Sequence, residues 1–179
     1  MSKRSRELVT AALVMAGLAA GSSVMVCAVA DPAPLPKPAQ RAKPYDNYVL
    51  GCGGCHGIDG VSNPRLVPQL RGQVGYFLQT QAGREYLVRV PNVAFYTVSN
   101  EELAQMLNYM VFTIGRDGVP ANARPYTASE VGRLRKSPLT EVSLIDYRNA
   151  LVEDLIAHHG APSGLRIYSG GDSYQQVYH

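Results

Sequence analysis

The sequence predicts an all-α fold, and three observations carry this prediction. Apolar residues recur at helical spacing between positions 103 and 114. Two S/T-x-x-E patterns, Ser99 with Glu102 and Thr127 with Glu130, are typical of capped helix starts. No alternating stretch of apolar and polar residues is long enough to indicate a strand.

Residues 1–30 have the pattern of a secretory signal peptide. A basic start is followed by an apolar run and by Ala-Val-Ala before Asp31, so we expect export and cleavage after Ala30. Two alternatives stay open. The apolar run 8–30 is long enough to remain as a membrane anchor, and Cys27 is a potential lipid attachment site.

Removing the leader changes the charge and the cysteine count. The leader holds Lys3, Arg4 and Arg6 against Glu7, so the formal net charge falls from +3 to about +1 without it. A nearly neutral protein gives no indication of a nucleic-acid partner. Two of the three cysteines remain, and they stand close together in the sequence.

The rest of the chain divides by composition. Five prolines in residues 31–44 predict an extended linker. We expect a compact domain over 45–115, a helical extension over 116–160 and a flexible tail over 161–179, which is rich in Gly, Ser and Tyr.

Within the compact domain we expect three helices. The first covers about 45–51, and the second covers about 74–82 and ends at Gly83. The third begins at the Ser99 capping box and ends at Gly115.

Two more helices are expected in the extension. One begins at Thr127, and the other covers about 143–159 and ends at Gly160. Its apolar face is predicted to hold Leu144, Leu151 and Leu155.

The stretch "NYVLGCGGCHGIDG", residues 47–60, contains the motif C-x-x-C-H. In an exported chain with only these two cysteines, Cys52 and Cys55 are spaced to form thioethers with the vinyl groups of one haem c, and His56 is placed to bind its iron. A redox disulfide is less well supported because no strand-helix-strand pattern surrounds the motif. A closed zinc site would need a fourth ligand, and no second C-x-x-C follows.

Around this motif the chain resembles the class I c-type cytochromes, especially the bacterial periplasmic proteins. The resemblance rests on "CHGIDG", "VPQLRGQVGYFL", "GRE" and "SNEELAQMLNYM", and it covers about residues 45–113. It implies a cytochrome c-like helical domain around one covalent haem, and a periplasmic location. By this resemblance His56 is the proximal ligand, and the backbone carbonyl of Pro68 accepts a hydrogen bond from its ring. The last helix of the domain would cross the first, with Tyr48 and Tyr109 in contact.

The chain departs from this family in the loop before the last helix, which usually supplies a methionine as the sixth iron ligand. Residues 84–99 contain no methionine or histidine, and Val90-Pro91 stands where the family often has Met-Pro. On a helical wheel, Met110 lies at the centre of the following apolar stripe and Met106 at its edge. We therefore expect Met110 as the sixth ligand, with Met106 as the next choice.

Other assignments of the sixth position stay open. Both methionines have an ordinary explanation as residues that fill the core. An iron with no sixth protein ligand, Tyr96 from the loop, and His158 or His159 are further candidates. The two histidines are also explained by a helix end, where the helix dipole favours their charged form.

Several basic residues have both a functional and an ordinary explanation. Arg71 and Arg84 are candidates for pairing with haem propionates, or are solvated surface residues. Arg133, Arg135 and Lys136 form a basic cluster that we interpret as a solvated helix face, with an acidic partner as the alternative.

The sequence as a whole predicts an electron carrier rather than an enzyme. Its cofactor would be one haem c, and its partners periplasmic redox proteins: a dehydrogenase as donor, and an oxidase or another cytochrome as acceptor. The missing loop methionine favours an alternative, an open-iron haem protein that binds a gas or acts as a peroxidase. A further alternative is a cytochrome subunit of a larger redox complex.

Overall fold

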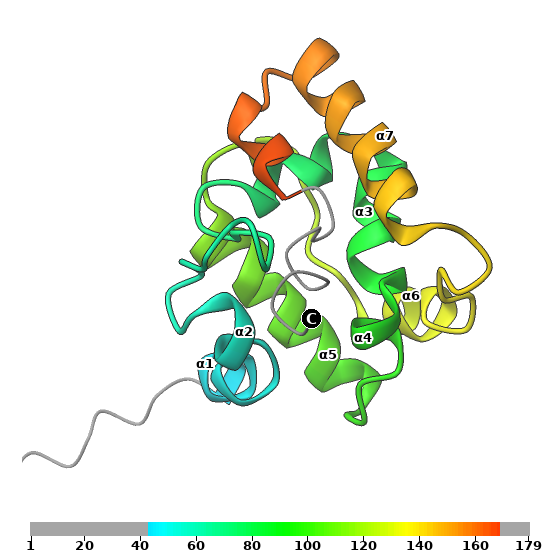
Figure 1. Cartoon of the computed structure of the whole chain (residues 1–179). Coiled ribbons are helices and arrows are strands. Elements are labelled where there is room, and N and C mark those ends of the chain that lie inside the picture. The colour runs from blue at the N-terminus through cyan, green and yellow to red at the C-terminus, as the bar shows by residue number, and fades with distance from the viewer. Residues whose placement is uncertain (1–42, 169–179) are drawn as a thin grey trace, which may run out of the picture. The chain divides into compact units, whose positions relative to one another are not determined.

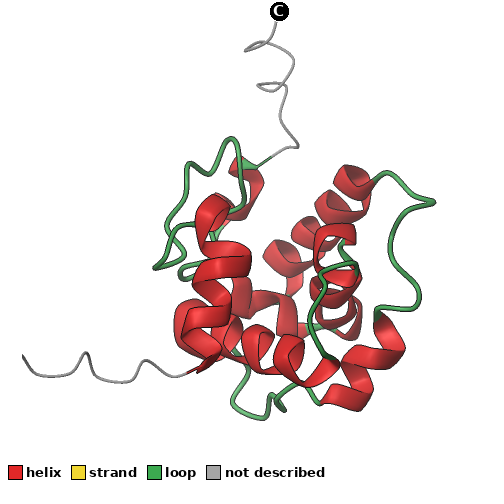
Figure 2. Ribbon diagram, turned by 90° about the horizontal axis from the view of Figure 1, so that it is seen from below, coloured by secondary structure: helices red, strands yellow, loops and turns green. Residues whose placement is uncertain are grey.

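The computed structural model describes residues 43–168, which all lie in one compact unit. The predicted signal peptide 1–30 lies outside the described residues, as does most of the linker 31–44. The described chain consists of helices joined by loops and has no strand, so the all-α prediction is confirmed (Figure 2). None of the helices in 43–168 has the length and apolar character that crossing a bilayer requires.

The first three elements form an almost continuous helical run that carries the C-x-x-C-H motif. They are α1 (Lys43–Tyr48), the π-helical turn η1 (Val49–Gly53) and α2 (Gly54–His56). Lys43 and Pro44, predicted to end the linker, already belong to α1. Proline is tolerated in a first helical turn because its missing N–H has no partner there in any case.

The second predicted helix is split and shifted. A 3₁₀ segment η2 (Val74–Gln79) is followed by α3 (Gln81–Arg89) and α4 (Pro91–Ala94). The prediction that Gly83 ends a helix is wrong, because the Thr80 hydroxyl caps α3 by accepting a hydrogen bond from the Gly83 N–H. Gly83 is required for space, since a Cβ there would lie 2.3 Å from the Phe77 carbonyl oxygen.

The third predicted helix is present with its capping box. It consists of α5 (Asn100–Asn108) and a π-helical continuation, η3 (Tyr109–Gly115). The Glu102 N–H donates to the Ser99 hydroxyl, and the Ser99 N–H donates to the Glu102 carboxylate. This helix packs against α1, where the Tyr48 and Tyr109 rings lie 5.7 Å apart, so the predicted aromatic contact is present.

The extension contains α6 (Ala128–Leu134), α7 (Leu144–His158) and the 3₁₀ segment η4 (Ser163–Ile167). It does not form a separate layer. Helix α6 packs on α5 and α3, and α7 packs on η2 and α3 (Figure 1). The predicted boundary at 115/116 therefore divides residues of one hydrophobic core.

The predicted flexible tail is only partly supported. Leu165 of η4 is buried in the core, and its carbonyl accepts a hydrogen bond from Arg148, a buried charged residue of α7. A second hydrogen bond joins Arg148 to the Tyr168 carbonyl. Residues 161–168 are thus part of the core. Two of their carbonyl groups accept hydrogen bonds from the Arg148 guanidinium, which has almost no contact with water. Residues 169–179 lie outside the described part.

Candidate haem site

The two cysteines and the histidine of the motif lie on one helical run, and the histidine is its last residue. Cys52 belongs to η1, and Cys55 and His56 belong to α2, so the two cysteines are three residues apart on a helical run. Gly57 stops the helix with φ +78°, and a Cβ there would lie 2.2 Å from the Val61 carbonyl oxygen. The chain turns sharply after the histidine because glycine alone fits this position without strain.

Tyr48 stabilises this turn through a hydrogen bond. Its side chain is fully buried, and its hydroxyl donates a hydrogen bond of 2.8 Å to the Gly57 carbonyl oxygen. Burial raises the pKa of the Tyr48 hydroxyl, so the group stays protonated and remains a donor. This bond joins α1 to the residue directly after His56.

The orientation of His56 is fixed by the hydrogen bond predicted with Pro68. Nδ1 of His56 lies 2.8 Å from the Pro68 carbonyl oxygen. Because a carbonyl only accepts, Nδ1 carries the proton, and in the neutral ring Nε2 keeps its lone pair. Burial lowers the pKa of His56 against a smaller opposing effect of this hydrogen bond, which favours the neutral form. Nε2 is therefore the nitrogen available to a metal.

Both cysteines are free thiols. Cys52 is partly buried and packs against the core, whereas Cys55 is exposed. Burial, with a smaller contribution from the nearby Cys55, raises the pKa of the Cys52 thiol to about 11.

A largely apolar cavity of about 130 Å³ opens beside these three residues. Three stretches of the chain, 51–56, 92–96 and 106–110, contribute to it, and the cavity is lined by Gly51, Cys52, Cys55, His56, Asn92, Val93, Tyr96, Met106, Leu107 and Met110. Both predicted methionines are thus brought to the same cavity as His56. Val93 and Asn92 were missed by the sequence analysis, although Pro91 at the first position of α4 is a signal for a helix start there.

Of the other ligand candidates, Tyr96 lines the cavity, whereas the two histidines lie elsewhere. His158 ends α7 and His159 follows as its cap, as predicted, and both rings lie close to the Asp154 carboxylate. Neither lines the cavity. No group of three or more His, Cys, Asp or Glu side chains within residues 43–168 is arranged to hold a metal ion, so a zinc site of that kind gains no support there.

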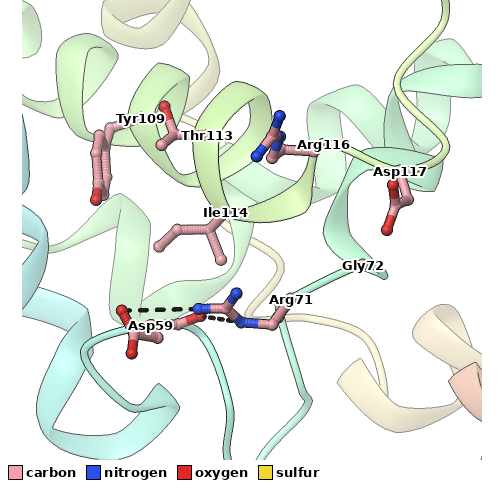
Figure 3. Close-up of a pocket in the computed structure, with 8 residues that line it drawn as sticks. All are labelled: Asp59, Arg71, Gly72, Tyr109, Thr113, Ile114, Arg116 and Asp117. Atoms are coloured by element: carbon pink, nitrogen blue, oxygen red, sulfur yellow. Dashed lines mark hydrogen bonds and ion pairs between the residues drawn. The ribbon is translucent and has the colours of Figure 1, made fainter.

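The two predicted propionate partners are not cavity residues. Arg71 donates to the Asp59 backbone carbonyl at 2.9 Å and lies 3.6 Å from the Asp59 carboxylate, in a separate hollow that Tyr109 also lines (Figure 3). Arg84 donates from Nε and Nη2 to the two oxygens of the Glu130 carboxylate, each at 2.7 Å, and its guanidinium lies over the Tyr126 ring. In this structure α3 directs Arg84 toward Glu130 of α6.

The donor set suits covalent haem. Two free thiols on one helical turn can form two thioethers, and a neutral imidazole with a fixed tautomer can bind iron in an apolar surrounding. Methionine sulfur at the same cavity is a second ligand type that haem iron accepts.

Comparison with known proteins agrees with this site. Cytochrome c-552 of Thermus thermophilus is 30 % identical over 118 residues, a match that covers 56 % of this chain and 90 % of the relative. A cytochrome c-552 from a particular strain of the same species is also 30 % identical over 118 residues, with 80 % of its length covered. No family model matches the chain. The C-x-x-C-H turn, its cavity and the length of relative that is matched lead to one conclusion: this chain belongs to the c-type cytochromes, which carry covalent haem c and transfer electrons.

Proposed function

We propose that the protein is a periplasmic carrier of single electrons with one haem c, of the class I type. It would take electrons from a dehydrogenase and pass them to an oxidase or another cytochrome, without catalysing a substrate reaction itself. The single motif C-x-x-C-H and the leader-like residues 1–30 support one haem and an exported location.

The observation that carries this proposal is the cavity itself. Cys52 and Cys55 would hold the haem as thioethers, and Nε2 of His56 would bind the iron while the Pro68 carbonyl keeps the ring oriented. When bound, the haem iron supplies a one-electron ferric/ferrous couple. The residues around the cavity would set the ligands of the group and its exposure to water, which are means by which a chain tunes such a potential.

Met110 is the sixth ligand that we propose. It lies at the start of the π-helical segment η3 and lines the cavity, one turn after Met106. Short π-helical segments inside helices are frequent at functional sites. An unbranched thioether with three side-chain torsions can extend its sulfur toward the iron from this helix.

Two large apolar side chains that adjoin cavity residues in the sequence are exposed. Leu50, which precedes Gly51, is 82 % exposed, and Phe95, which precedes Tyr96, is 61 % exposed. We propose that redox partners contact these two side chains.

The proposal is tested by producing the full chain with its leader in a bacterial host that attaches haem c. One covalent haem per chain, recovery from the periplasmic fraction and a reversible one-electron potential are the expected results. Cys52→Ser should reduce covalent attachment while leaving the leader intact. A chain without covalent haem, or one that shows no redox transition, would overturn the proposal.

One observation favours a second function. Because residues 84–99 contain no methionine or histidine, an open iron that binds a gas or acts as a peroxidase is the alternative. Rapid, stoichiometric binding of carbon monoxide to the reduced protein would support that function, and an unchanged spectrum would support the electron carrier.

A further inference from the structure

Arg135 binds the segment that forms one wall of the haem cavity. Its Nε donates to the Ala94 carbonyl at 2.9 Å, and its Nη1 donates to the Val98 carbonyl at 3.0 Å and to the Asn100 side chain at 3.2 Å. Its Nη2 donates to the Tyr96 carbonyl. One guanidinium therefore joins four acceptors within seven residues, and we call this group of bonds the Arg135 clamp.

The segment between α4 and α5 has little other support of its own. Its own backbone hydrogen bonds are short-range, from the Phe95 N–H to Pro91, from the Tyr96 N–H to Val93 and from the Val98 N–H to Tyr96. The planar fork of arginine presents five donors in fixed directions and can reach acceptors on several sides, whereas the three donors of lysine radiate from one nitrogen. Arg135 thus fixes the course of the segment.

Neighbouring residues of the extension approach the same wall. A Cβ on Gly132 of α6 would lie 2.6 Å from the Asn100 side chain, so α6 lies directly against the start of α5. The Arg89 Nε donates to the Ser137 carbonyl at 2.7 Å, and the Leu139 N–H donates to the Arg89 carbonyl at 2.9 Å. The stretch 132–139 is therefore bonded to both ends of the wall, at α3 and at α5.

Tyr96 connects the clamp to the cysteine-bearing turn. Its backbone carbonyl is held by Arg135, and its side chain lines the cavity together with Cys52 and His56. A Cβ on Gly51 would lie 2.8 Å from the Tyr96 hydroxyl oxygen and 2.9 Å from its Cζ. The hydroxyl end of the ring therefore rests on Gly51, the residue before Cys52.

We propose that Arg135 is a positioning residue of the haem site, which holds Tyr96 across the cavity and so restricts the access of water and small ligands to the iron. For the effect on iron, this inference rests on the proposed function. The clamp replaces the interpretation of Arg135 as part of a solvated basic face. Control of solvent access by surrounding residues is one of the ways in which a protein sets a potential.

The test uses the full-length protein with its haem and the variant Arg135→Lys. This variant keeps the positive charge, so any change reports the lost fork rather than a lost charge. Arg133→Lys is the matched control, because Arg133 lies in the last turn of α6, two residues before the capping residue Arg135, is exposed and lines a different hollow.

Three measurements decide the proposal. Amide hydrogen exchange at Tyr96 and Val98 should become about tenfold faster or more in Arg135→Lys, as expected for losing one hydrogen bond to a charged group. In the proposed carrier Met110 leaves carbon monoxide little or no access to the iron, so carbon monoxide binding to the reduced protein should become detectable or faster in Arg135→Lys, and the reduction potential should shift. Arg133→Lys should change none of the three.

A second variant displaces the Tyr96 ring without removing the hydrogen bonds of Arg135. Gly51→Ala leaves Arg135 in place but gives the Tyr96 ring no room, so it should raise the carbon monoxide rate without faster exchange at Val98. Faster exchange in Arg135→Lys with an unchanged carbon monoxide rate and potential would make Arg135 merely structural and overturn the proposal. Unchanged amide exchange at Tyr96 and Val98 in Arg135→Lys would also overturn the proposal. If Arg135→Lys does not fold, an unchanged carbon monoxide rate in Gly51→Ala would overturn it. A failure of the proposed function differs from these outcomes, because the wild-type chain would then lack covalent haem.

Discussion

Replacing Met110 by leucine, with Met106→Leu as the matched variant, distinguishes an iron ligand from a core methionine. Both side chains are buried, at 8 % and 4 % exposure, and both line the cavity. Leucine has nearly the same volume, so each exchange should cost less than about 1.5 kcal/mol of unfolding free energy. The fold should therefore survive in both variants, with Tm lowered by a few degrees.

If a methionine only fills the core, its replacement can change the reduction potential by no more than this packing free energy. If all of about 1.4 kcal/mol fell on one oxidation state, the potential would move by about 60 mV, the shift for a tenfold change in a one-electron couple. Axial ligands, in contrast, set haem potentials over about 0.8 V. We therefore expect Met110→Leu to lower the potential by well over 60 mV and Met106→Leu to shift it by less.

The assay is a potentiometric titration of each purified variant, read together with its ferric spectrum. Met110→Leu should become high-spin or lose its sulfur-to-iron charge-transfer band, and Met106→Leu should keep the wild-type spectrum. The reverse pattern would assign the ligand to Met106. If neither variant changes the spectrum, and both potentials stay within about 60 mV of wild type, no helix methionine binds the iron.

Three further predictions concern the frame of the site and the extension. Tyr48→Phe should lower stability by about 1–3 kcal/mol, because the Gly57 carbonyl loses its buried donor, and an unchanged thermal melt would contradict this. The Arg84 guanidinium holds the pKa of the Glu130 carboxyl below its usual value, so the pair stabilises the fold above pH about 4.5 and this stability is lost as the pH falls further. Glu130→Gln should therefore weaken the fall of Tm between about pH 5 and 3, and an unchanged slope would show that the pair contributes nothing. Leu165→Ala, at a side chain that is 1 % exposed, should cost about 2–5 kcal/mol in chemical denaturation, whereas a loose tail would tolerate it.

Local signals in the sequence were sufficient for the helices that begin with a cap. Ser99 forms the complete predicted box with Glu102, and α5 begins at the next residue. Thr127 also caps α6 by accepting from the Glu130 N–H, but the Glu130 side chain does not reach back to complete the box. It pairs with Arg84 instead, and a sequence pattern that spans four residues holds no information about a partner 46 positions away.

The site was predictable where its residues are close in sequence. The motif gave Cys52, Cys55 and His56, and the family resemblance gave Pro68. A helical wheel brought Met106 and Met110 to one face, although it assumed α-helical geometry through η3, where the structure is π-helical. The wall with Val93 and Tyr96 was treated as loop, because a four-residue helix such as α4 leaves almost no periodic pattern.

The predicted boundary between a haem domain and an extension runs through one hydrophobic core, and there is a physical reason for this. The ring of Tyr86 on α3 stacks on Phe77 at 5.5 Å on one side and on Tyr147 of α7 at 6.0 Å on the other. Amphipathic helices in an extension must bury their apolar faces somewhere, and here α6 and α7 bury them on α3, α5 and η2. Helix α3 leads through α4 into the segment that carries Tyr96. In the extension, Arg135 is bonded to this segment and Leu139 to the end of α3. The residues after Gly115 therefore help to shape the cavity in which iron ligation is proposed.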